Sequence, residues 1–141
     1  MENNIKAILI EKINKSVWWH VAPKDVNAYK KRGKFLASTY AQAEFYGRPN
    51  DVPEKASVNN PIYGRSEIEI LKNLFTKNYK KLFSTISDDV GGYASRISLD
   101  AKMFRKANKM GYDAIVLLGS NGIKYLSKNR KPHSIELNLC K

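Results

Sequence analysis

The sequence predicts an α+β fold in one domain that spans residues 1–141. Three observations support this prediction. Segments rich in β-branched and aromatic residues gather towards both ends of the chain, segments with a helical spacing of apolar residues lie between them, and strand and helix do not alternate regularly. A chain of 141 residues with 43% hydrophobic residues is long enough for one buried core and too short for two.

Two strands and a short helix are expected first. Residues 5–13 are rich in isoleucine, and residues 16–22 contain β-branched and aromatic residues, so both segments favour strands. Residues 23–33 then favour a basic helix, because Pro23 suits its first position and Gly33 its end.

The next segments predict a strand, a helix and a long connection. Residues 34–39 favour a strand, and Thr39 followed by Gln42 has the form of a capping box that opens a helix. We expect this helix to stop at Gly47. Residues 47–64 contain three prolines, which favours an irregular loop over a site.

The second half of the chain predicts two more helices among further strands. An amphipathic helix is expected at residues 74–86, and a second helix from Ser98 to Gly111. The expected strands lie at residues 66–73, 112–118, 123–126 and 133–139, with a turn at residues 119–122.

The composition limits the classes of function. Twenty-five Lys and Arg against 13 Asp and Glu give a net charge of +12, which attracts polyanions. The basic residues are spread along the chain, so the charge alone does not separate nucleic-acid binding from a lysine-rich composition. The longest apolar run, from Ala114 to Leu118, is far shorter than the roughly 20 residues of a membrane span. We expect a cytoplasmic protein without a transmembrane segment or secretory signal.

Common catalytic and metal-binding patterns are absent. The chain lacks the glycine-rich phosphate loops, the zinc-protease motif and the serine-hydrolase elbow. Its one cysteine, Cys140, gives no disulfide and no metal-ligand spacing, and nothing near it in the sequence would activate it as a nucleophile. No metal site is therefore expected.

Three remaining segments carry a resemblance to a known family. Residues 17–20, VWWH, end a strand on a histidine, and residues 33–46 hold a glycine, an aromatic residue, an apolar residue, alanine and serine before a short helix that ends on tyrosine. Residues 106–118, KANKMGYDAIVLL, precede a terminal strand. Together they resemble the ADP-ribosyltransferase-like fold, particularly the poly(ADP-ribose) polymerase branch and its small bacterial and phage relatives.

The resemblance implies a specific architecture and activity. It implies split antiparallel β-sheets flanked by short helices, with a cleft for NAD between the sheets. The implied activity is mono-ADP-ribosyl transfer, in which NAD is cleaved and ADP-ribose is passed to a macromolecule, either a protein or a nucleic acid. Many small domains of this kind are phage or bacterial effectors, which is an analogy of fold.

The resemblance also assigns roles to residues of the cofactor site. His20 would hydrogen-bond the ribose hydroxyls, and Tyr46 and Phe35 would stack on nicotinamide. Val21 stands where the family usually has a glycine whose backbone holds the nicotinamide amide. The remaining cofactor-binding residues expected from the resemblance are Ser38 and Ser134.

The expected catalytic residues are Glu136, His20 and Tyr46. The family's catalytic glutamate opens the last strand, where Ser134 stands in this chain, and Glu136 lies two residues, or about 6.6 Å, further on and faces the same side. Either the register is shifted and Glu136 is the catalytic carboxylate, or this member lacks one. The possible substitutes are Glu67 and Glu69.

Two alternatives remain open at this point. The chain is either an ADP-ribosyltransferase or a module of the same fold that has lost its chemistry and grips nucleic acid or an acidic protein through its basic surface. A different NAD-dependent reaction, the removal of an RNA 2′-phosphate, also occurs on this general fold. The basic clusters that would serve any of them lie at residues 30–34 and 124–131.

Overall fold

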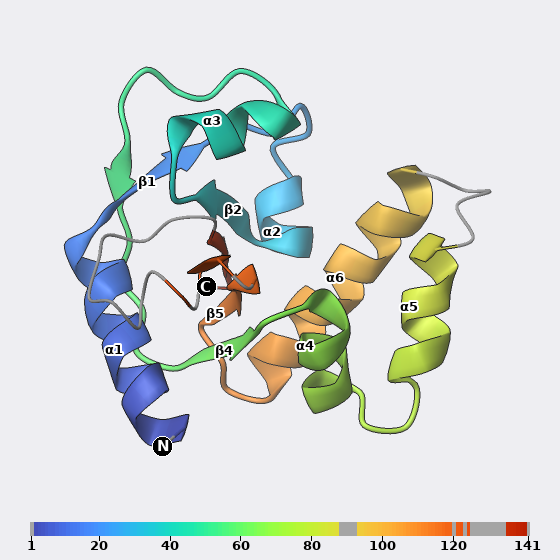
Figure 1. Ribbon diagram of the computed structural model, residues 1–141. Helices are drawn as coiled ribbons and strands as arrows, with labels where there is room; N and C mark the ends of the chain where they lie inside the picture. The colour runs from blue at the N-terminus through green and yellow to red at the C-terminus, as the bar shows by residue number, and fades with distance from the viewer. Residues whose placement is uncertain (1, 88–92, 120, 123, 125–134, 141) are drawn as a thin grey trace.

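The computed structural model describes residues 2–87, 93–119, 121–122, 124 and 135–140. Helices and strands are mixed along the chain, which confirms the predicted α+β class (Figure 1). The helices are α1 (Glu2–Lys15), α2 (Ala28–Arg32), α3 (Tyr40–Ala43), the 3₁₀ helix η1 (Glu44–Tyr46), α4 (Glu67–Leu74), α5 (Tyr79–Ser87) and α6 (Tyr93–Lys109). The strands are β1 (Val17–His20), β2 (Lys34–Ala37), β3 (Glu54–Lys55), β4 (Pro61–Gly64), β5 (Ala114–Leu117) and β6 (Glu136–Leu139).

The described strands form one open mixed sheet in the order β3-β1-β2-β6-β5-β4. Only β4 and β5 run parallel, and every other neighbouring pair is antiparallel. This arrangement differs from the expected split antiparallel sheets. The reason is the position of β6, which pairs with β2 on one side and β5 on the other and so joins the two groups of strands. The described strands leave no division between two sheets in which an NAD cleft would lie.

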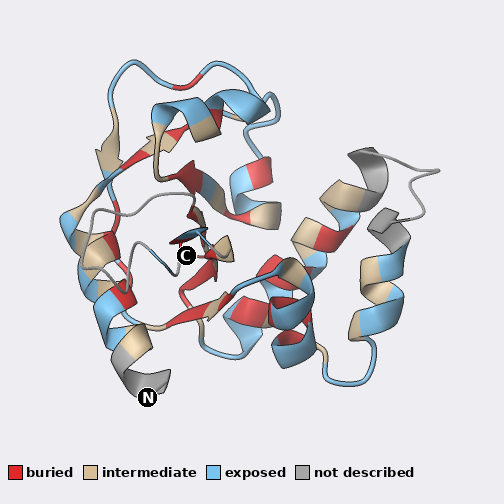
Figure 2. Cartoon of the chain, in the orientation of Figure 1, coloured by how far each residue is buried: buried red, intermediate tan, exposed pale blue. Residues whose placement is uncertain are grey.

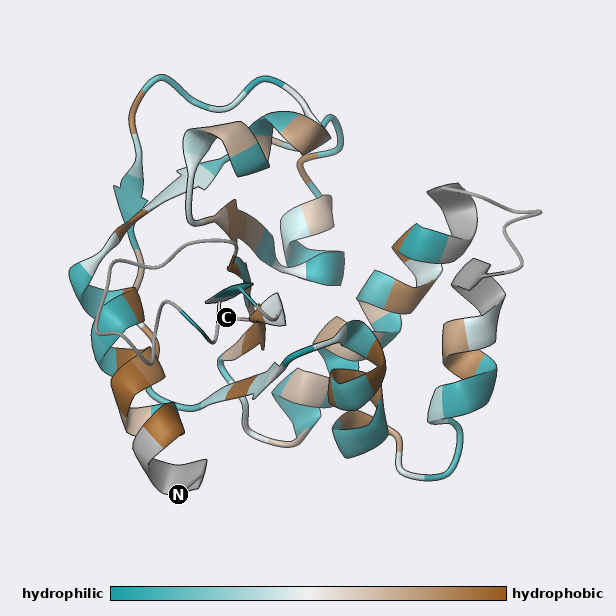
Figure 3. Ribbon diagram, in the orientation of Figure 1, coloured by the Kyte–Doolittle hydropathy of each residue, from teal (hydrophilic) through white to brown (hydrophobic). Residues whose placement is uncertain are grey.

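Each face of the sheet has its own hydrophobic core. On one face, α1 buries Leu9 and Ile13 against the strands, together with Leu36, Val116 and Leu137. On the other face, α4 and α6 pack against the strands, with α5 alongside them (Figure 1). Figure 2 shows the buried residues along the strands and on the inner sides of α1, α4 and α6. In Figure 3 the last turn of α2 is hydrophilic, unlike the hydrophobic residues of the strands and of α1.

The N-terminal prediction of a strand at residues 5–13 is wrong, because this segment lies in α1. Leu9 and Ile13 are four residues apart and both are fully buried, which is the spacing of one helix face. An exposed pair four residues apart, Glu11 and Lys15, adds a further helical contact at 2.8 Å. Burial of the side that carries Leu9 and Ile13 outweighs the strand propensity of the β-branched residues.

The strand predicted at residues 66–73 is also wrong, because α4 occupies this segment. Ser66 caps the helix, since its hydroxyl accepts a hydrogen bond from the Glu69 backbone amide at 3.3 Å. Ile70, Leu71 and Leu74 then bury one side of the helix. The alternation of polar and apolar residues that suggested a strand is short. The serine cap and the apolar residue at position 74 indicated a helix instead.

Other elements follow the predictions more closely. The strands predicted at residues 16–22, 34–39, 112–118 and 133–139 contain β1, β2, β5 and β6. The basic helix predicted at residues 23–33 is the shorter α2, which begins at Ala28 and not at Pro23. The Thr39 hydroxyl accepts from the Gln42 amide at 3.2 Å, so the predicted cap of α3 is confirmed. The connection at residues 47–64 is less irregular than expected, because it contains β3 and β4.

Four further predictions need correction. The helix expected at residues 74–86 begins later, as α5 at Tyr79. The helix α6 starts at Tyr93, before the predicted start at Ser98. Within the predicted strand at residues 123–126 the structure describes Lys124 alone, and that residue is helical. The predicted turn at residues 119–122 is wrong in the same way, since its described residues are helical as well.

Gly33 is required where α2 turns into β2. Its φ of +86° lies in the left-handed region that disfavours residues with a Cβ atom. A Cβ at this position would lie 2.2 Å from Asn138 Oδ1 and 2.5 Å from the Leu139 carbonyl oxygen. Glycine therefore allows α2 and the start of β2 to pack directly on β6.

Replacement of Gly33 by alanine is expected to destabilise the fold strongly. Gly111 is the matched control, because its φ is +90° and a Cβ there would meet nothing within 4 Å. We expect Gly111→Ala to cost about 1–2 kcal/mol for the backbone conformation alone. Gly33→Ala adds the steric clash, for an extra cost of about 1–3 kcal/mol in the free energy of urea unfolding. Equal losses in the two variants would contradict this account of Gly33.

Candidate functional site

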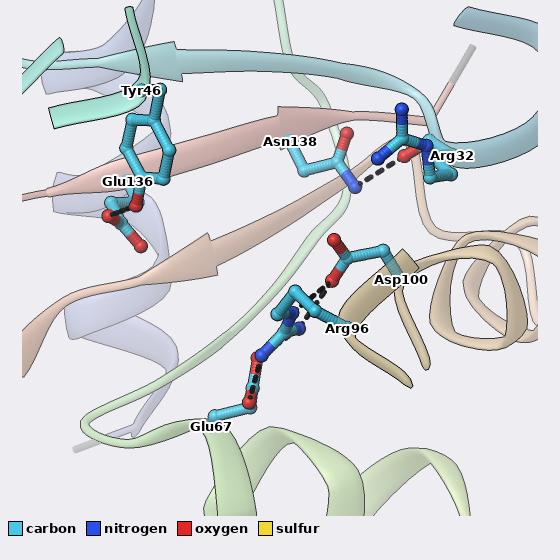
Figure 4. A network of polar contacts seen from close by, with 7 residues as sticks. All are labelled: Arg32, Tyr46, Glu67, Arg96, Asp100, Glu136 and Asn138. Carbon is cyan, nitrogen blue, oxygen red and sulfur yellow. Dashed lines mark hydrogen bonds and ion pairs between the residues drawn. The ribbon is translucent and has the colours of Figure 1, made fainter. Parts of the chain in front are cut away.

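Two segments from opposite ends of the chain meet in one polar site. The Tyr46 hydroxyl, at the end of η1, donates a hydrogen bond to Glu136 Oε1, on the first residue of β6 (Figure 4). The two residues are 90 positions apart in the sequence. The structure therefore brings together two of the three residues that the sequence analysis placed in the catalytic set.

Local structure explains how each of these side chains is presented. The Thr39 cap starts α3, the chain tightens into η1, and Gly47 ends it with a φ of +142°. The strand β6 begins at Glu136, so this carboxylate opens the last strand. The resemblance placed the opening of the last strand at Ser134, two residues earlier, but the strand opens at Glu136 itself. Ser134 lies outside the described residues.

Ser38 holds the two segments in place. Its hydroxyl accepts a hydrogen bond from the Ile135 backbone amide at 3.1 Å and donates one to the Gln42 side chain at 2.9 Å. Its own amide donates to the Ile135 carbonyl at 3.1 Å. Ser38 thus fixes the residue before Glu136 relative to α3, and these bonds occupy the polar groups that the sequence analysis assigned to cofactor binding.

The hydroxyl of Tyr46 is held in its neutral form. Partial desolvation is the largest cause and the Glu136 carboxylate is the next, and together they raise the pKa of Tyr46 above its ordinary value. The residue as a whole is 65% exposed, so the aromatic ring remains accessible while the hydroxyl end is engaged. The arrangement offers a ring for stacking beside a carboxylate of fixed orientation.

A second cluster faces this pair across the sheet surface. The Arg96 guanidinium on α6 donates two hydrogen bonds of 2.6 Å to the two carboxylate oxygens of Glu67, and it also bonds Asp100 through Nε at 3.0 Å. Figure 4 shows these residues below Glu136 and Asn138 of β6. Arg96 and Asp100 are close enough to act electrostatically on Tyr46.

The charges in this cluster stabilise one another. Desolvation opposes the charged form of Arg96, but its hydrogen bonds to Glu67 and Asp100 outweigh that cost and raise its pKa. Desolvation is also the largest cause at Asp100, where it raises the pKa although Arg96 acts in the opposite direction. Sequence analysis missed Arg96 and Asp100, and their spacing of four residues on a helix was the available signal.

His20 does not join Tyr46 and Glu136. Its side chain is 4% exposed, its Nδ1 lies 2.7 Å from the Phe35 carbonyl oxygen, and its Nε2 lies 2.9 Å from the Tyr29 hydroxyl. Because a carbonyl only accepts, Nδ1 carries a proton and donates to Phe35, and the Tyr29 hydroxyl is the partner of Nε2. Both ring nitrogens are therefore used in internal contacts.

The sheet register explains this placement. Opposite residues on antiparallel strands share a face, so Trp19, Ala37 and Glu136 lie on one face. His20 aligns with Leu36, which aligns with Leu137 of the core under α1. His20 thus points to the opposite face of the sheet from Glu136.

The expected cofactor residues Val21 and Phe35 lie around a small cavity. It is lined by both of them together with His20, Tyr29 and Arg32, and its volume is about 40 Å³. That space suits one or a few water molecules and not a dinucleotide. The Phe35 side chain is 44% exposed and belongs to the same sheet face as Glu136, because it aligns with Asn138.

Asn138 connects this region to the strand that carries Glu136. It is 6% exposed, and its Nδ2 donates to the Arg32 carbonyl at 2.9 Å. Its Oδ1 is buried without a hydrogen-bond partner, which is an uncommon state for a buried acceptor. Nothing in the sequence singled out this residue within the expected last strand.

The other candidate residues have structural roles or none. Glu67 is committed to Arg96, and Glu69 is exposed on α4. Cys140 is fully buried, and desolvation followed by the Asp113 charge raises its thiol pKa to about 12. Among the described residues there is no group of three His, Cys, Asp or Glu side chains placed to hold a metal ion. None of the described helices has the length and apolar character needed to cross a membrane.

Comparisons with protein-family models, with curated proteins and with solved structures find no match to this chain.

The ionisation of Tyr46 can be measured directly. In the folded protein we expect the ¹³Cζ resonance of Tyr46 to titrate at higher pH than an exposed tyrosine, and Glu136→Gln to shift its titration down towards the ordinary value of about 10. Since an unfolded tyrosine ionises near that pH while the folded one stays neutral, stability should fall as the pH rises above about 10. Tyr46→Phe identifies the resonance. An unchanged titration in Glu136→Gln would show that the carboxylate does not act on Tyr46.

Cys140 is expected to be unreactive while the protein is folded. Its burial and raised pKa leave almost no thiolate near neutral pH. A thiol reagent should modify native protein at least about 100-fold more slowly than protein unfolded in concentrated urea, because three pKa units correspond to roughly a thousandfold less thiolate. Fast labelling of the folded protein would contradict the burial of this thiol.

Proposed function

We propose that the chain is a mono-ADP-ribosyltransferase that cleaves NAD and transfers ADP-ribose to a macromolecule, with Glu136 and Tyr46 at the reacting centre. The observation that carries the proposal is the hydrogen bond between these two side chains. It joins one of the segments that carry the resemblance, residues 33–46, to the terminal strand. A carboxylate that opens the last strand also agrees with the position of the catalytic glutamate in the family.

The proposed chemistry needs few groups. Cleavage of the bond between nicotinamide and ribose C1′ releases neutral nicotinamide and leaves positive charge on the ribose. The Glu136 carboxylate would stabilise that charge, as a preorganised negative group does in a partly water-excluded site. The acceptor then forms a bond to C1′ and loses a proton to water. The exposed rings of Tyr46 and Phe35 supply faces on which nicotinamide can stack.

The proposal changes the role of His20. Its ring nitrogens hold the Phe35 carbonyl and the Tyr29 hydroxyl, so His20 acts through the backbone at Phe35 and not on a ribose hydroxyl. The small cavity beside His20 does not take the dinucleotide. In this proposal NAD therefore lies on the opposite sheet face, which carries Phe35 and Glu136 and is reached by the Tyr46 hydroxyl from η1.

One set of observations favours a second candidate, a binding module of similar fold without chemistry. The His20 contacts and the small cavity both fit a site that has lost its substrate. The net charge of +12 would then serve to bind a polyanion. Turnover of NAD separates the two candidates.

The enzymatic proposal is tested by incubating the protein with labelled NAD and a cell extract. We expect a labelled macromolecule and released nicotinamide. Glu136→Gln should lower both by about 100-fold, because it removes a charge that stabilises the transition state. Tyr46→Phe keeps the ring and loses the hydroxyl that orients Glu136, so we expect a loss of about tenfold.

The matched control is Glu44→Gln, an exposed glutamate on η1 two residues before Tyr46. It should keep its labelling, and all variants should unfold at the same temperature as the parent. Absence of NAD turnover in the parent protein, or full turnover in Glu136→Gln, would refute the proposal.

A further inference from the structure

The exposed aromatic residues of the described chain gather in one segment. Among the residues whose burial the structure describes, every aromatic residue that is 37% or more exposed lies between residues 29 and 46. Phe45, at 92% exposed, is the extreme case. The five members of this set are Tyr29, Phe35, Tyr40, Phe45 and Tyr46.

The same stretch is strongly basic. Residues 24–48 contain six Lys and Arg against two acidic residues. The last turn of α2 consists of basic residues, and Figure 3 shows it as hydrophilic. Lys34 is closely paired with Glu54 and is left out of the set, whereas Lys31 meets Asp25 only at 4.0 Å and its side chain is 68% exposed, so it is kept. The remaining basic residues are Lys24, Lys30, Lys31, Arg32 and Arg48.

Backbone contacts hold the two parts of this stretch together. The Asn50 amide donates to the His20 carbonyl at 2.8 Å, so the chain that leaves η1 runs along the end of β1. The connection from β1 then leads into α2, and Figure 1 shows α2 and α3 at the same end of the molecule. We call the five aromatic and five basic residues the aromatic–basic surface.

We propose that the aromatic–basic surface binds single-stranded nucleic acid and presents it to Tyr46 and Glu136 as the acceptor of ADP-ribose. Exposed rings offer stacking faces to unpaired bases, and the cations contact the phosphates. An acidic protein partner would contact the cations, but it would not explain the exposed aromatic rings. The part of the proposal that concerns the acceptor rests on the proposed function, whereas the binding does not.

The position of Phe45 relative to Tyr46 suits this arrangement. The two residues are consecutive in η1, where side chains diverge by about a third of a turn. The Tyr46 hydroxyl reaches Glu136, and Phe45 points into solvent. A base stacked on Phe45 would thus lie next to the reacting centre.

The transfer step balances without an additional reactant. An N–H or O–H group of the nucleic acid attacks ribose C1′ of NAD, the bond from C1′ to nicotinamide breaks, and nicotinamide leaves with the bonding electrons. The attacking group loses its proton to water. No oxidation or reduction occurs.

The binding is tested by fluorescence anisotropy with the intact protein. The probes are a labelled RNA and a labelled DNA of about 20 nucleotides, longer than the roughly 4–16 nucleotides typical of small binding domains, with a duplex of the same length and polyglutamate as competitors. We expect both single strands to bind more tightly than the duplex. Equal binding of the duplex, or equal competition by polyglutamate, would overturn the stacking interpretation.

Two variants probe the two parts of the surface. Phe45→Ala should weaken single-strand binding about tenfold, as expected for one lost stacking contact. The double variant Lys30→Ala with Lys31→Ala should lower the slope of log K against log salt by up to about 1.4, at about 0.7 for each phosphate contact. Since all three residues are exposed, the variants should keep the parent's unfolding temperature.

The matched controls lie on α4 and just after it. Ile68→Ala removes another exposed apolar side chain, and Lys72→Ala with Lys77→Ala removes two other exposed charges. Both control variants should bind with an affinity within about twofold of the parent and with the parent's dependence on salt. An equal loss in the control and test variants would overturn the assignment of this surface.

Failure of this inference differs from failure of the proposed function. With labelled NAD present, label should appear on the oligonucleotide, and Glu136→Gln should abolish it without weakening binding. Binding without NAD turnover would refute the proposed function and leave the surface in place. NAD turnover without oligonucleotide binding would refute the surface and leave the transferase.

Discussion

The pairing of β6 with β2 on one side and β5 on the other holds the sheet together. This last strand pairs antiparallel with both neighbours over its whole length. It supplies Leu137 to the core under α1, and it presents Glu136 and Asn138 on the other face. Without it the antiparallel strands of the first half and the parallel β4–β5 pair would be separate units, each with unpaired edges.

The contacts around β6 also assemble the candidate site. Ser38 bonds the backbone of Ile135 in both directions, and Asn138 bonds the end of α2 through the Arg32 carbonyl. Gly33 permits this close approach because it has no Cβ. These contacts fix both the start of α3 and the end of α2 against one strand. The Tyr46 hydroxyl therefore reaches Glu136 from a scaffold that is held at two points.

His20, in the VWWH segment, shows that a sequence motif does not tell which face of a sheet a side chain points to. Spacing in the sequence placed His20 at the end of a strand, and that is where the structure has it. Its face is set by pairing with β2, where it aligns with Leu36 and not with Ala37. A shift of one residue in register would move the imidazole to the face of Glu136. Long-range pairing decides this register, and the local sequence does not contain it.

Features that depend on neighbouring residues could be predicted from the amino-acid sequence. The α+β class, the strands β1, β2, β5 and β6, the basic helix α2 and the Thr39 cap of α3 all follow from local spacing and capping chemistry. Tyr46 and Glu136 could also be predicted as site residues, because Tyr46 ends the short helix and Glu136 opens the last strand.

Long-range packing sets the secondary structure of two segments and the residues that make up the polar site. Residues 5–13 and 66–73 carry strand-like patterns, yet both form helices, because their apolar sides are buried against the sheet. Arg96, Asp100 and Asn138 join the polar site through contacts between elements far apart in the chain. Such contacts are decided by burial and by pairing over long sequence separations, and local residue preferences do not encode either one.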